Sequence, residues 1–250
     1  MPHALEPPRC EWCANAMCGV VGTPSAVAGA LNSMVNLVPQ SPLARLLLGY
    51  APAAARGHHA RAWVLDERLA AILQGGREPA LMAIRLAWWR DALAHEDHSK
   101  GKGEPLIEAF RVAGLTAFER EMIGACIEGW SRIAGAEDLS EADLRAYAQG
   151  RGGGLFGLIA GDDAPGLMAA GAAWALWDLA GHVSDPELAQ MCLLTAAGFV
   201  EDVDTRLIKA HRPLRLALLV ATGDIRARRV PRNGFALYHY ARIVLAGLLR

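Results

Sequence analysis

The sequence has little that predicts β-structure. No run of alternating β-branched and aromatic residues is long enough to form a strand. Apolar residues instead recur at helical spacing in one segment after another, and 53% of the residues are hydrophobic. At 250 residues the chain is long enough to bury a substantial core. We therefore expect an all-α protein.

Familiar catalytic motifs are also absent. The chain contains no Gly-x-x-x-x-Gly-Lys-Ser/Thr phosphate loop, no Gly-x-Ser-x-Gly elbow and no His-Glu-x-x-His zinc helix. The formal net charge is -1, so no overall positive field would attract nucleic acid. An enzyme with this sequence would have to use carboxylates, arginines or a cavity, and we expect no nucleic-acid partner.

A convincing membrane span and a secretory signal are missing as well. The longest apolar run, 164–183, is about long enough to cross a bilayer, but it is rich in Ala and Gly and contains Asp178 and His182. Glu6 and Arg9 interrupt the N-terminus before any apolar stretch of signal length. We therefore expect the run to form a buried helix. We also expect the protein to be cytoplasmic, and peripheral membrane contact stays open.

The N-terminal segment has few large apolar residues. It holds three of the five cysteines, at Cys10, Cys13 and Cys18. Their spacing resembles part of a zinc or iron-sulfur ligand set that His3 would complete, but no second Cys-x-x-Cys follows. Because a segment this rich in Pro and Gly buries little surface, we expect residues 1–40 to form a loosely ordered leader without a metal. A single helical domain is expected over 41–250.

Capping signals set the expected helix boundaries. Ser41-Pro42 is suited to starting a helix, Thr116 with Glu119 forms a capping box, and Gly75-Gly76 is a glycine stop. The expected helices span about 43–54, 58–74, 79–95, 104–112, 117–130, 141–159, 165–183, 186–203, 213–221 and 233–250. At the start of the expected helix over 58–74, His58-His59 is expected to be a surface feature and not a ligand pair.

The stretch 76–93, which reads GREPALMAIRLAWWRDAL, has apolar residues on almost every face of its helix. Such a pattern predicts a helix buried among other helices. Trp88 and Trp89 lie about 100° apart around the axis, so one can face a cavity while the other packs against a neighbour. In a buried helix, the charged side chains of Arg85 and Arg90 would need to contact a carboxylate, a phosphate or water.

Four glycines interrupt the helical pattern after Tyr147, at Gly150, Gly152, Gly153 and Gly154. Glycine inside a helix costs roughly 1 kcal/mol relative to alanine. The run therefore predicts either a kink or the close approach of another helix or a ligand.

The carboxylates that could face a cavity are Asp66 and Glu67 in the second expected helix and Asp178 in the helix over 165–183. A magnesium-diphosphate site needs several carboxylates from facing helices. One turn beyond Asp66 stands Ala70, and one turn beyond Asp178 stands His182, so neither helix offers an aspartate pair at i, i+4. A solvated helix face remains the alternative for Asp66 and Glu67.

Several segments together resemble bacterial squalene/phytoene synthase-type proteins. They are Tyr50-Ala-Pro-Ala-Ala-Ala-Arg56, Leu65-Asp66 and Arg77-Glu-Pro79 followed by Ile84-Arg-Leu-Ala-Trp-Trp-Arg-Asp-Ala-Leu93. Tyr147 with its glycines and the segment 173–180 resemble later parts of the same family. The resemblance implies an isoprenoid-synthase fold, in which helices surround a deep apolar cavity. It also implies two aspartate-rich motifs whose magnesium ions hold prenyl diphosphates for head-to-head condensation.

Carried onto this sequence, the first motif begins at Asp66-Glu67 and ends in Ala70, while the second runs from Asp178 to His182 and lacks its closing acid. The C-terminal third shows no match to the family's Gly-Arg-Tyr/Val-Leu-Pro region. The resemblance therefore implies a degenerate branch with lost or reduced prenyl transfer, which binds a prenyl lipid or acts in complex assembly.

Two alternatives stay open. In the first, the protein is an active magnesium-dependent prenyl-diphosphate transferase. Asp66, Glu67 and Asp178 would then be catalytic, and the substrate would be bound by Arg85, Tyr147 and His182. In the second, the protein is a scaffold whose helical surface binds a protein partner.

Overall fold

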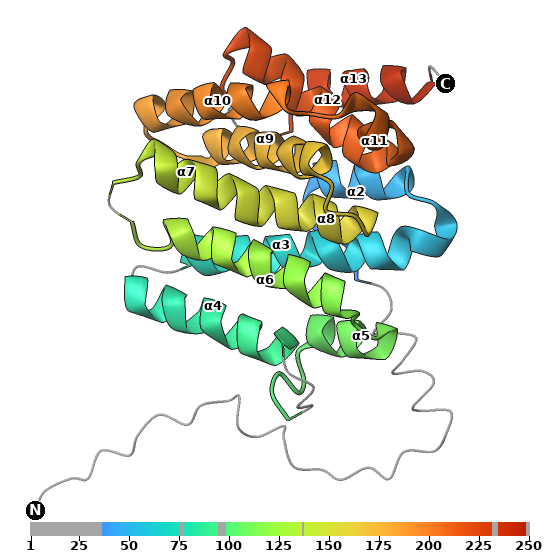
Figure 1. Ribbon diagram of the computed structural model, residues 1–250, viewed down its shortest axis with the longest axis vertical. Coiled ribbons are helices and arrows are strands. Elements are labelled where there is room, and N and C mark those ends of the chain that lie inside the picture. The colour runs from blue at the N-terminus through green and yellow to red at the C-terminus, as the bar shows by residue number, and fades with distance from the viewer. Residues whose placement is uncertain (1–36, 76–77, 95–98, 137, 232–234, 249–250) are drawn as a thin grey trace, which may run out of the picture.

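The computed structural model describes residues 37–75, 78–94, 99–136, 138–231 and 235–248. Over these ranges the chain is helical and has no strand, so the all-α prediction is confirmed. The helices stack in layers with their axes roughly aligned, and α4 and α13 lie at opposite ends of the stack (Figure 1). Cys10, Cys13, Cys18 and His3 lie outside the described residues, so a metal site among them stays untested.

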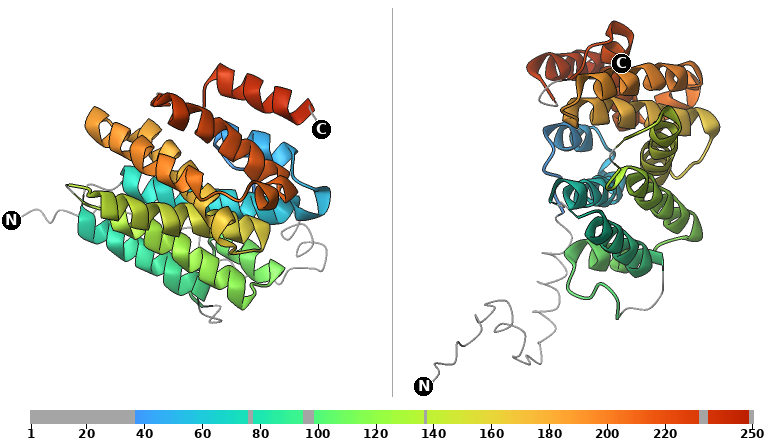
Figure 2. Two further views of the ribbon diagram at one scale, coloured as in Figure 1. Left: turned by 45° about the horizontal axis from the view of Figure 1, so that its top comes forward. Right: turned by 90° about the vertical axis from the view of Figure 1, so that its left-hand side faces the viewer.

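The elements follow one another with short connections. They are α2 (Pro42–Gly49), η2 (Ala53–Ala55), α3 (Arg56–Gly75), α4 (Pro79–Ala94), α5 (Pro105–Ala113), α6 (Ala117–Ile133), α7 (Glu141–Tyr147), η3 (Ala148–Gly153), α8 (Gly154–Ala160), α9 (Pro165–His182), α10 (Pro186–Glu201), α11 (Thr205–Ala210), α12 (Arg212–Ala227) and α13 (Leu237–Leu248). Figure 2 shows that α2 and α3 form one side of the stack, beside the layer made by α6, α7 and α8.

The capping signals act as the sequence predicts. Ser41 caps α2 and is followed by Pro42. Thr116 Oγ1 accepts from Glu119 N–H at 3.1 Å, and the Glu119 carboxylate accepts from Thr116 N–H at 2.8 Å. These reciprocal bonds satisfy backbone donors that the first turn of α6 leaves unpaired.

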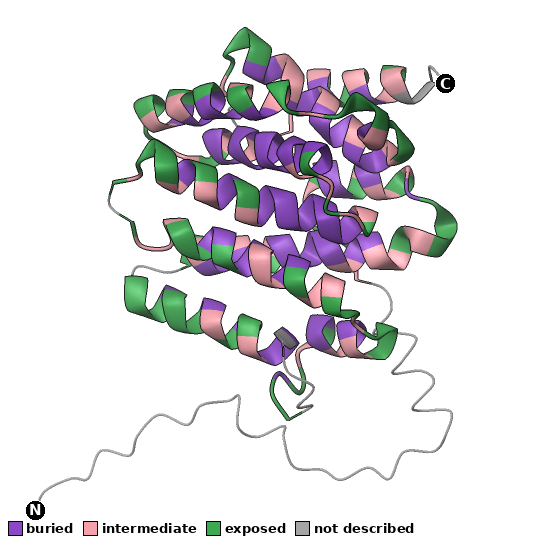
Figure 3. Ribbon diagram, in the orientation of Figure 1, coloured by how far each residue is buried: buried purple, intermediate pink, exposed green. Residues whose placement is uncertain are grey.

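Helix α9 forms the centre of the core. It packs against η3, α8, α10 and α12, and its Ala- and Gly-rich surface is almost entirely buried (Figure 3). The prediction that the run 164–183 is a buried helix is therefore confirmed. Within the described ranges, no helix has the length and apolar character needed to cross a bilayer.

Glycines let α9 and α6 approach the turn η3 to backbone contact. A Cβ atom on Gly152 would lie 2.1 Å from the carbonyl oxygen of Gly171 in α9. On the other side, a Cβ atom on Gly129 of α6 would lie 2.2 Å from the backbone nitrogen of Arg151. The predicted close approach is confirmed, and η3 is a π-helical turn of the kind often found at functional sites.

The expectation that the helix over 79–95 is buried on all sides is wrong. Helix α4 packs on α3 and α6 with one face only. On its other face, Leu81, Ile84 and Trp88 are 48%, 63% and 43% exposed. Trp89 is buried, and neither Trp88 nor Trp89 is among the residues that line the cavity beside α2, α3 and α9. The prediction of a fully buried helix failed because α4 lies at one end of the stack, where nothing among the described residues covers its outer face.

The histidine pair is also less exposed than expected. His59 is buried, and burial together with His58 and His211 lowers its pKa from 6.5 to about 4. His58 Nε2 lies 2.6 Å from the carbonyl oxygen of Leu158. The pair therefore belongs to the packing of α3 on α8, and the prediction of a surface feature is wrong.

The glycine contact between η3 and α9 yields a stability prediction. Gly152→Ala should lower the free energy of unfolding by more than about 2 kcal/mol, because the added methyl group meets a backbone carbonyl that cannot move alone. Gly124→Ala in α6 is the matched control, since nothing lies within 4 Å of its added Cβ atom. The control should be neutral or more stable by up to about 1 kcal/mol. Equal unfolding curves for the two variants would contradict this account.

Candidate functional site

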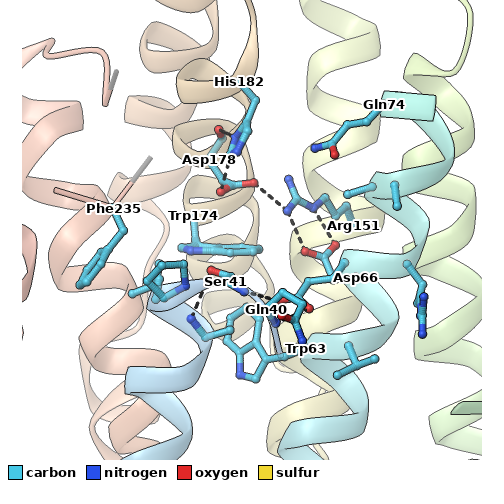
Figure 4. A pocket seen from close by; sticks show the side chains of 18 of the residues that line it. Gln40, Ser41, Trp63, Asp66, Gln74, Arg151, Trp174, Asp178, His182 and Phe235 are labelled. Atoms are coloured by element: carbon cyan, nitrogen blue, oxygen red, sulfur yellow. Dashed lines mark hydrogen bonds and ion pairs between the residues drawn. The ribbon is translucent and has the colours of Figure 1, made fainter. Parts of the chain in front are cut away.

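A cavity of about 800 Å³ opens between α2, α3, η3 and α9. One part of its wall is apolar and largely aromatic, formed by Leu43, Trp63, Val64, Trp174, Trp177 and Phe235. A second part, the polar wall, is formed by Asp66, Glu67, Arg68, Gln74, Arg151, Asp178 and His182. Figure 4 shows the two parts side by side, with the Asp66, Arg151 and Asp178 side chains pointing toward one another.

Arg151 joins the two aspartates across the polar wall. Its Nε donates to Asp66 Oδ1 at 2.8 Å and its Nη2 to Asp66 Oδ2 at 2.7 Å, which is a bidentate pair. The same Nη2 also donates to Asp178 Oδ2 at 2.8 Å. Helices α3 and α9 are thus linked through a guanidinium that is only 3% exposed.

Aromatic side chains hold this guanidinium in place. Its central carbon lies 4.3 Å from the ring centroid of Trp130 and 4.9 Å from that of Trp174. Trp130 Nε1 also donates to Asp66 Oδ1 at 2.9 Å, and Arg151 Nη1 donates to the hydroxyl oxygen of Tyr147. Ring faces of this kind attract a cation and exclude water from the pair.

Burial and charge act in opposite directions on the titration of this group. Burial alone would lower the pKa of Arg151, but Asp66, Tyr147 and Asp178 outweigh it and raise the pKa well above its usual value. For the neutral Tyr147 phenol the effect of burial has the opposite sign, and burial raises its pKa. Arg151 is therefore a permanent cation, and Tyr147 is not available as a base near neutral pH.

The structure brings together Asp66 and Asp178, as the sequence suggested for two facing motifs. Glu67 lines the same cavity, but its carboxylate accepts from the backbone N–H groups of Gln40 and Ser41 at 2.8 Å and 2.7 Å. It therefore secures the start of α2. Of the two residues that replace the missing acids, Ala70 offers no oxygen and His182 lies at the cavity rim.

Two predicted substrate-binding residues lie elsewhere. Arg85 is exposed on α4 and is not among the residues that line the cavity, so the structure does not bring it to the aspartates. Tyr147 is fully buried and contacts Arg151 from behind the polar wall. The third, His182, does line the cavity, and its Nδ1 lies 2.7 Å from the backbone carbonyl oxygen of Asp178.

Arg151 itself was missed by the sequence reasoning. The glycines around it suggested a kink or the close approach of another helix or a ligand, but not a partner for the aspartates. One signal was available, because the residues one turn before and after it are Tyr147 and Leu155. A cation in an apolar helical segment without a carboxylate at i±4 needs a partner from another helix.

The described residues do not fit a magnesium-diphosphate site. They contain no group of three or more His, Cys, Asp or Glu side chains placed to hold a metal ion. Both oxygens of Asp66 are already engaged by Arg151 and Trp130. Magnesium needs several free oxygen ligands in an octahedron, and here only Asp178 keeps an oxygen that makes no hydrogen bond to the described residues.

A second buried carboxylate lies behind the aromatic wall. Asp224 in α12 accepts from Trp177 Nε1 at 3.0 Å, from the Tyr238 hydroxyl at 2.9 Å and from His239 Nε2 at 2.7 Å. The backbone N–H of Ala236 donates to His239 Nδ1, which leaves Nε2 as the protonated nitrogen. This cluster fastens α13 to α12 and to the cavity wall, and no sequence pattern predicted it.

The first prediction for the site concerns the buried ion pair. Arg151→Met should destabilise the fold by about 3–5 kcal/mol, because Asp66 is left buried without its cation. Arg151→Met combined with Asp66→Asn should recover part of that loss. Arg132→Met, which breaks an exposed pair with Glu128, should cost less than about 1 kcal/mol. Denaturant unfolding measures the wild type, these three variants and the single Asp66→Asn variant, and strictly additive effects of the Arg151 and Asp66 changes would refute the coupling.

A second prediction concerns acid stability. Burial would raise the pKa of Asp224, but hydrogen bonds from His239, Trp177 and Tyr238 outweigh it and hold the pKa below its usual value. Because folding lowers the pKa of Asp224, its carboxylate stabilises the fold at pH values above the usual aspartate pKa. This contribution to the free energy of unfolding is lost as the pH falls through the lowered pKa. Asp224→Asn should therefore flatten the fall in unfolding free energy below about pH 4. The exposed control Glu121→Gln should keep the wild-type slope, and an unchanged slope in Asp224→Asn would be the contrary result.

Comparison of the chain with protein-family models, with curated proteins and with solved structures gives no match. Function is therefore inferred from the chemistry of the cavity.

Proposed function

We propose that the protein is a squalene/phytoene synthase-like helical protein that binds an isoprenoid lipid but does not catalyse prenyl transfer. The observation that carries this proposal is the bridge from Asp66 through Arg151 to Asp178. A buried guanidinium occupies the position between two facing helices where the resemblance implies magnesium and diphosphate.

The bridge is costly to open. Removing Arg151 from Asp66 would leave a buried carboxylate without its cation, a loss of several kcal/mol. Ala70 and His182 do not supply replacement acids. An active transferase would have to move Arg151 away and still gather enough oxygen ligands, so we favour the inactive branch over the active enzyme.

The cavity itself supports the binding role. Its volume of about 800 Å³ lies within the usual range for small-molecule sites, roughly 300–1,000 Å³. The aromatic wall can cover a hydrocarbon chain while the polar wall contacts a head group. A lipid with both parts matches this division better than a wholly polar metabolite does.

A role in complex assembly is a second candidate, favoured by one observation. The outer face of α4 exposes Leu81, Ile84 and Trp88 within one helix. Exposed apolar clusters of this kind mark surfaces that bind a partner or a membrane. Lipid binding and complex assembly are compatible because the cavity and α4 are separate.

We place the protein in the cytoplasm, with at most peripheral membrane association.

Catalysis is tested directly with farnesyl or geranylgeranyl diphosphate and magnesium. The purified protein should release no pyrophosphate above the rate of an Asp66→Asn variant, because the wild-type carboxylates are already engaged. Condensation that depends on Asp66 and Asp178 would overturn the proposal and favour the active transferase.

Lipid binding is tested by filling the cavity. Native mass spectrometry after incubation with farnesol, and separately with farnesyl diphosphate, should detect at least one of the two bound to the wild-type chain. Ala70→Trp projects a large side chain into the cavity and should reduce that binding at least about tenfold. Val112→Trp, at an exposed position of α5 away from the cavity, should leave it unchanged. No lipid bound to any form would refute this part of the proposal.

A further inference from the structure

We propose that the cavity selects an isoprenoid whose head group donates hydrogen bonds and carries no negative charge, such as a prenyl alcohol or amine, over a prenyl diphosphate. This inference rests on the proposed lipid-binding function and adds the class of ligand. It follows from how the charges of the polar wall are already used.

The cavity is lined by more acids than cations. Three carboxylates, those of Asp66, Glu67 and Asp178, face two guanidiniums, those of Arg68 and Arg151. A diphosphate brings further negative charge to a wall that is already slightly negative. In the low dielectric of a partly enclosed site, like charges a few ångströms apart repel strongly.

Neither cation is placed to receive a diphosphate. Arg151 is 3% exposed and gives Nε and Nη2 to the two aspartates. Its planar fork is therefore directed at Asp66 and not toward the opening of the cavity. Arg68 is exposed on α3, where water screens its charge.

Two polar groups that remain for a ligand beside Arg151, one on Asp178 and one on His182, are hydrogen-bond acceptors. Asp178 Oδ2 is bonded to Arg151, while Oδ1 lies 3.8 Å from His182 Nδ1, beyond hydrogen-bond distance. His182 Nδ1 faces the carbonyl oxygen of Asp178, so this nitrogen carries the hydrogen, and in that tautomer Nε2 is an acceptor. A hydroxyl or an ammonium group can donate to both positions.

The aromatic wall completes the selection. Trp63, Trp177 and Phe235 line the cavity together with Trp174, which Figure 4 shows next to Asp178. Their rings can cover the double bonds and methyl groups of a prenyl chain, and ring faces also attract an ammonium group. The site therefore combines an apolar chain position with an acceptor-rich head position.

The decisive experiment compares three ligands that share one tail: farnesol, farnesylamine and farnesyl diphosphate. Each is titrated below its aggregation concentration into the full-length protein, and binding is followed by isothermal titration calorimetry and native mass spectrometry. The alcohol and the amine should each bind at least about tenfold more tightly than the diphosphate, with or without magnesium. A diphosphate that binds as tightly as the alcohol or more tightly overturns the inference and leaves lipid binding intact.

Replacing the free acceptor identifies its role. Asp178→Asn keeps an oxygen for Arg151 but removes the charge, so it should weaken the amine about tenfold, strengthen the diphosphate and change the alcohol little. Glu121→Gln removes one negative charge from an exposed site on α6 and should change none of the three. Equal effects of the two substitutions would show that overall charge, not Asp178, decides the preference, and would overturn the inference.

The results also separate the two proposals and the two head groups. If none of the three ligands binds, the lipid-binding function fails, and the inference fails with it. An amine preference that falls as the salt concentration rises supports an ammonium head, whereas equal and salt-independent binding of alcohol and amine supports a hydroxyl head.

Discussion

The interaction on which the cavity depends is the buried contact of Arg151 with Asp66 and Asp178. It links α3 to η3 and α9, and η3 and α9 also meet at backbone contact between Gly152 and Gly171. A buried ion pair need not make the fold more stable than apolar side chains of the same shape would. Removing only one of its partners, however, strongly destabilises the fold. The contact therefore fixes one arrangement of the three elements and determines which charges the cavity presents to a ligand.

Local backbone geometry makes this contact reachable. The π-helical turn over Ala148–Gly153 directs Arg151 between two aromatic rings. Glycines on both sides of that turn let α6 and α9 approach to backbone contact. A Cβ atom on either side would push the helices apart and widen the space around the guanidinium. Small residues and a buried cation are thus two parts of the same packing solution.

Sequence reasoning predicted the regular parts of the fold well. Helix starts could be predicted from local signals, since Ser41 and Thr116 each satisfy a backbone donor three residues along the chain. The approach of Asp66 and Asp178 followed from the family resemblance. The exposure of α4 could not be predicted, because an apolar helix pattern is the same whether or not a further layer covers it. Arg151 was missed because its partners are 85 and 27 residues away, and no local pattern reports such distances.

The central claim is that Arg151 holds the position that a metal would need. It is tested most directly by a crystal structure of the protein grown with manganese and a non-hydrolysable farnesyl thiodiphosphate, with the metal located by its anomalous scattering. The account predicts no manganese peak between the two aspartates and an Arg151 side chain still bonded to both. A manganese ion bound by Asp66 and Asp178, with Arg151 displaced, would contradict it.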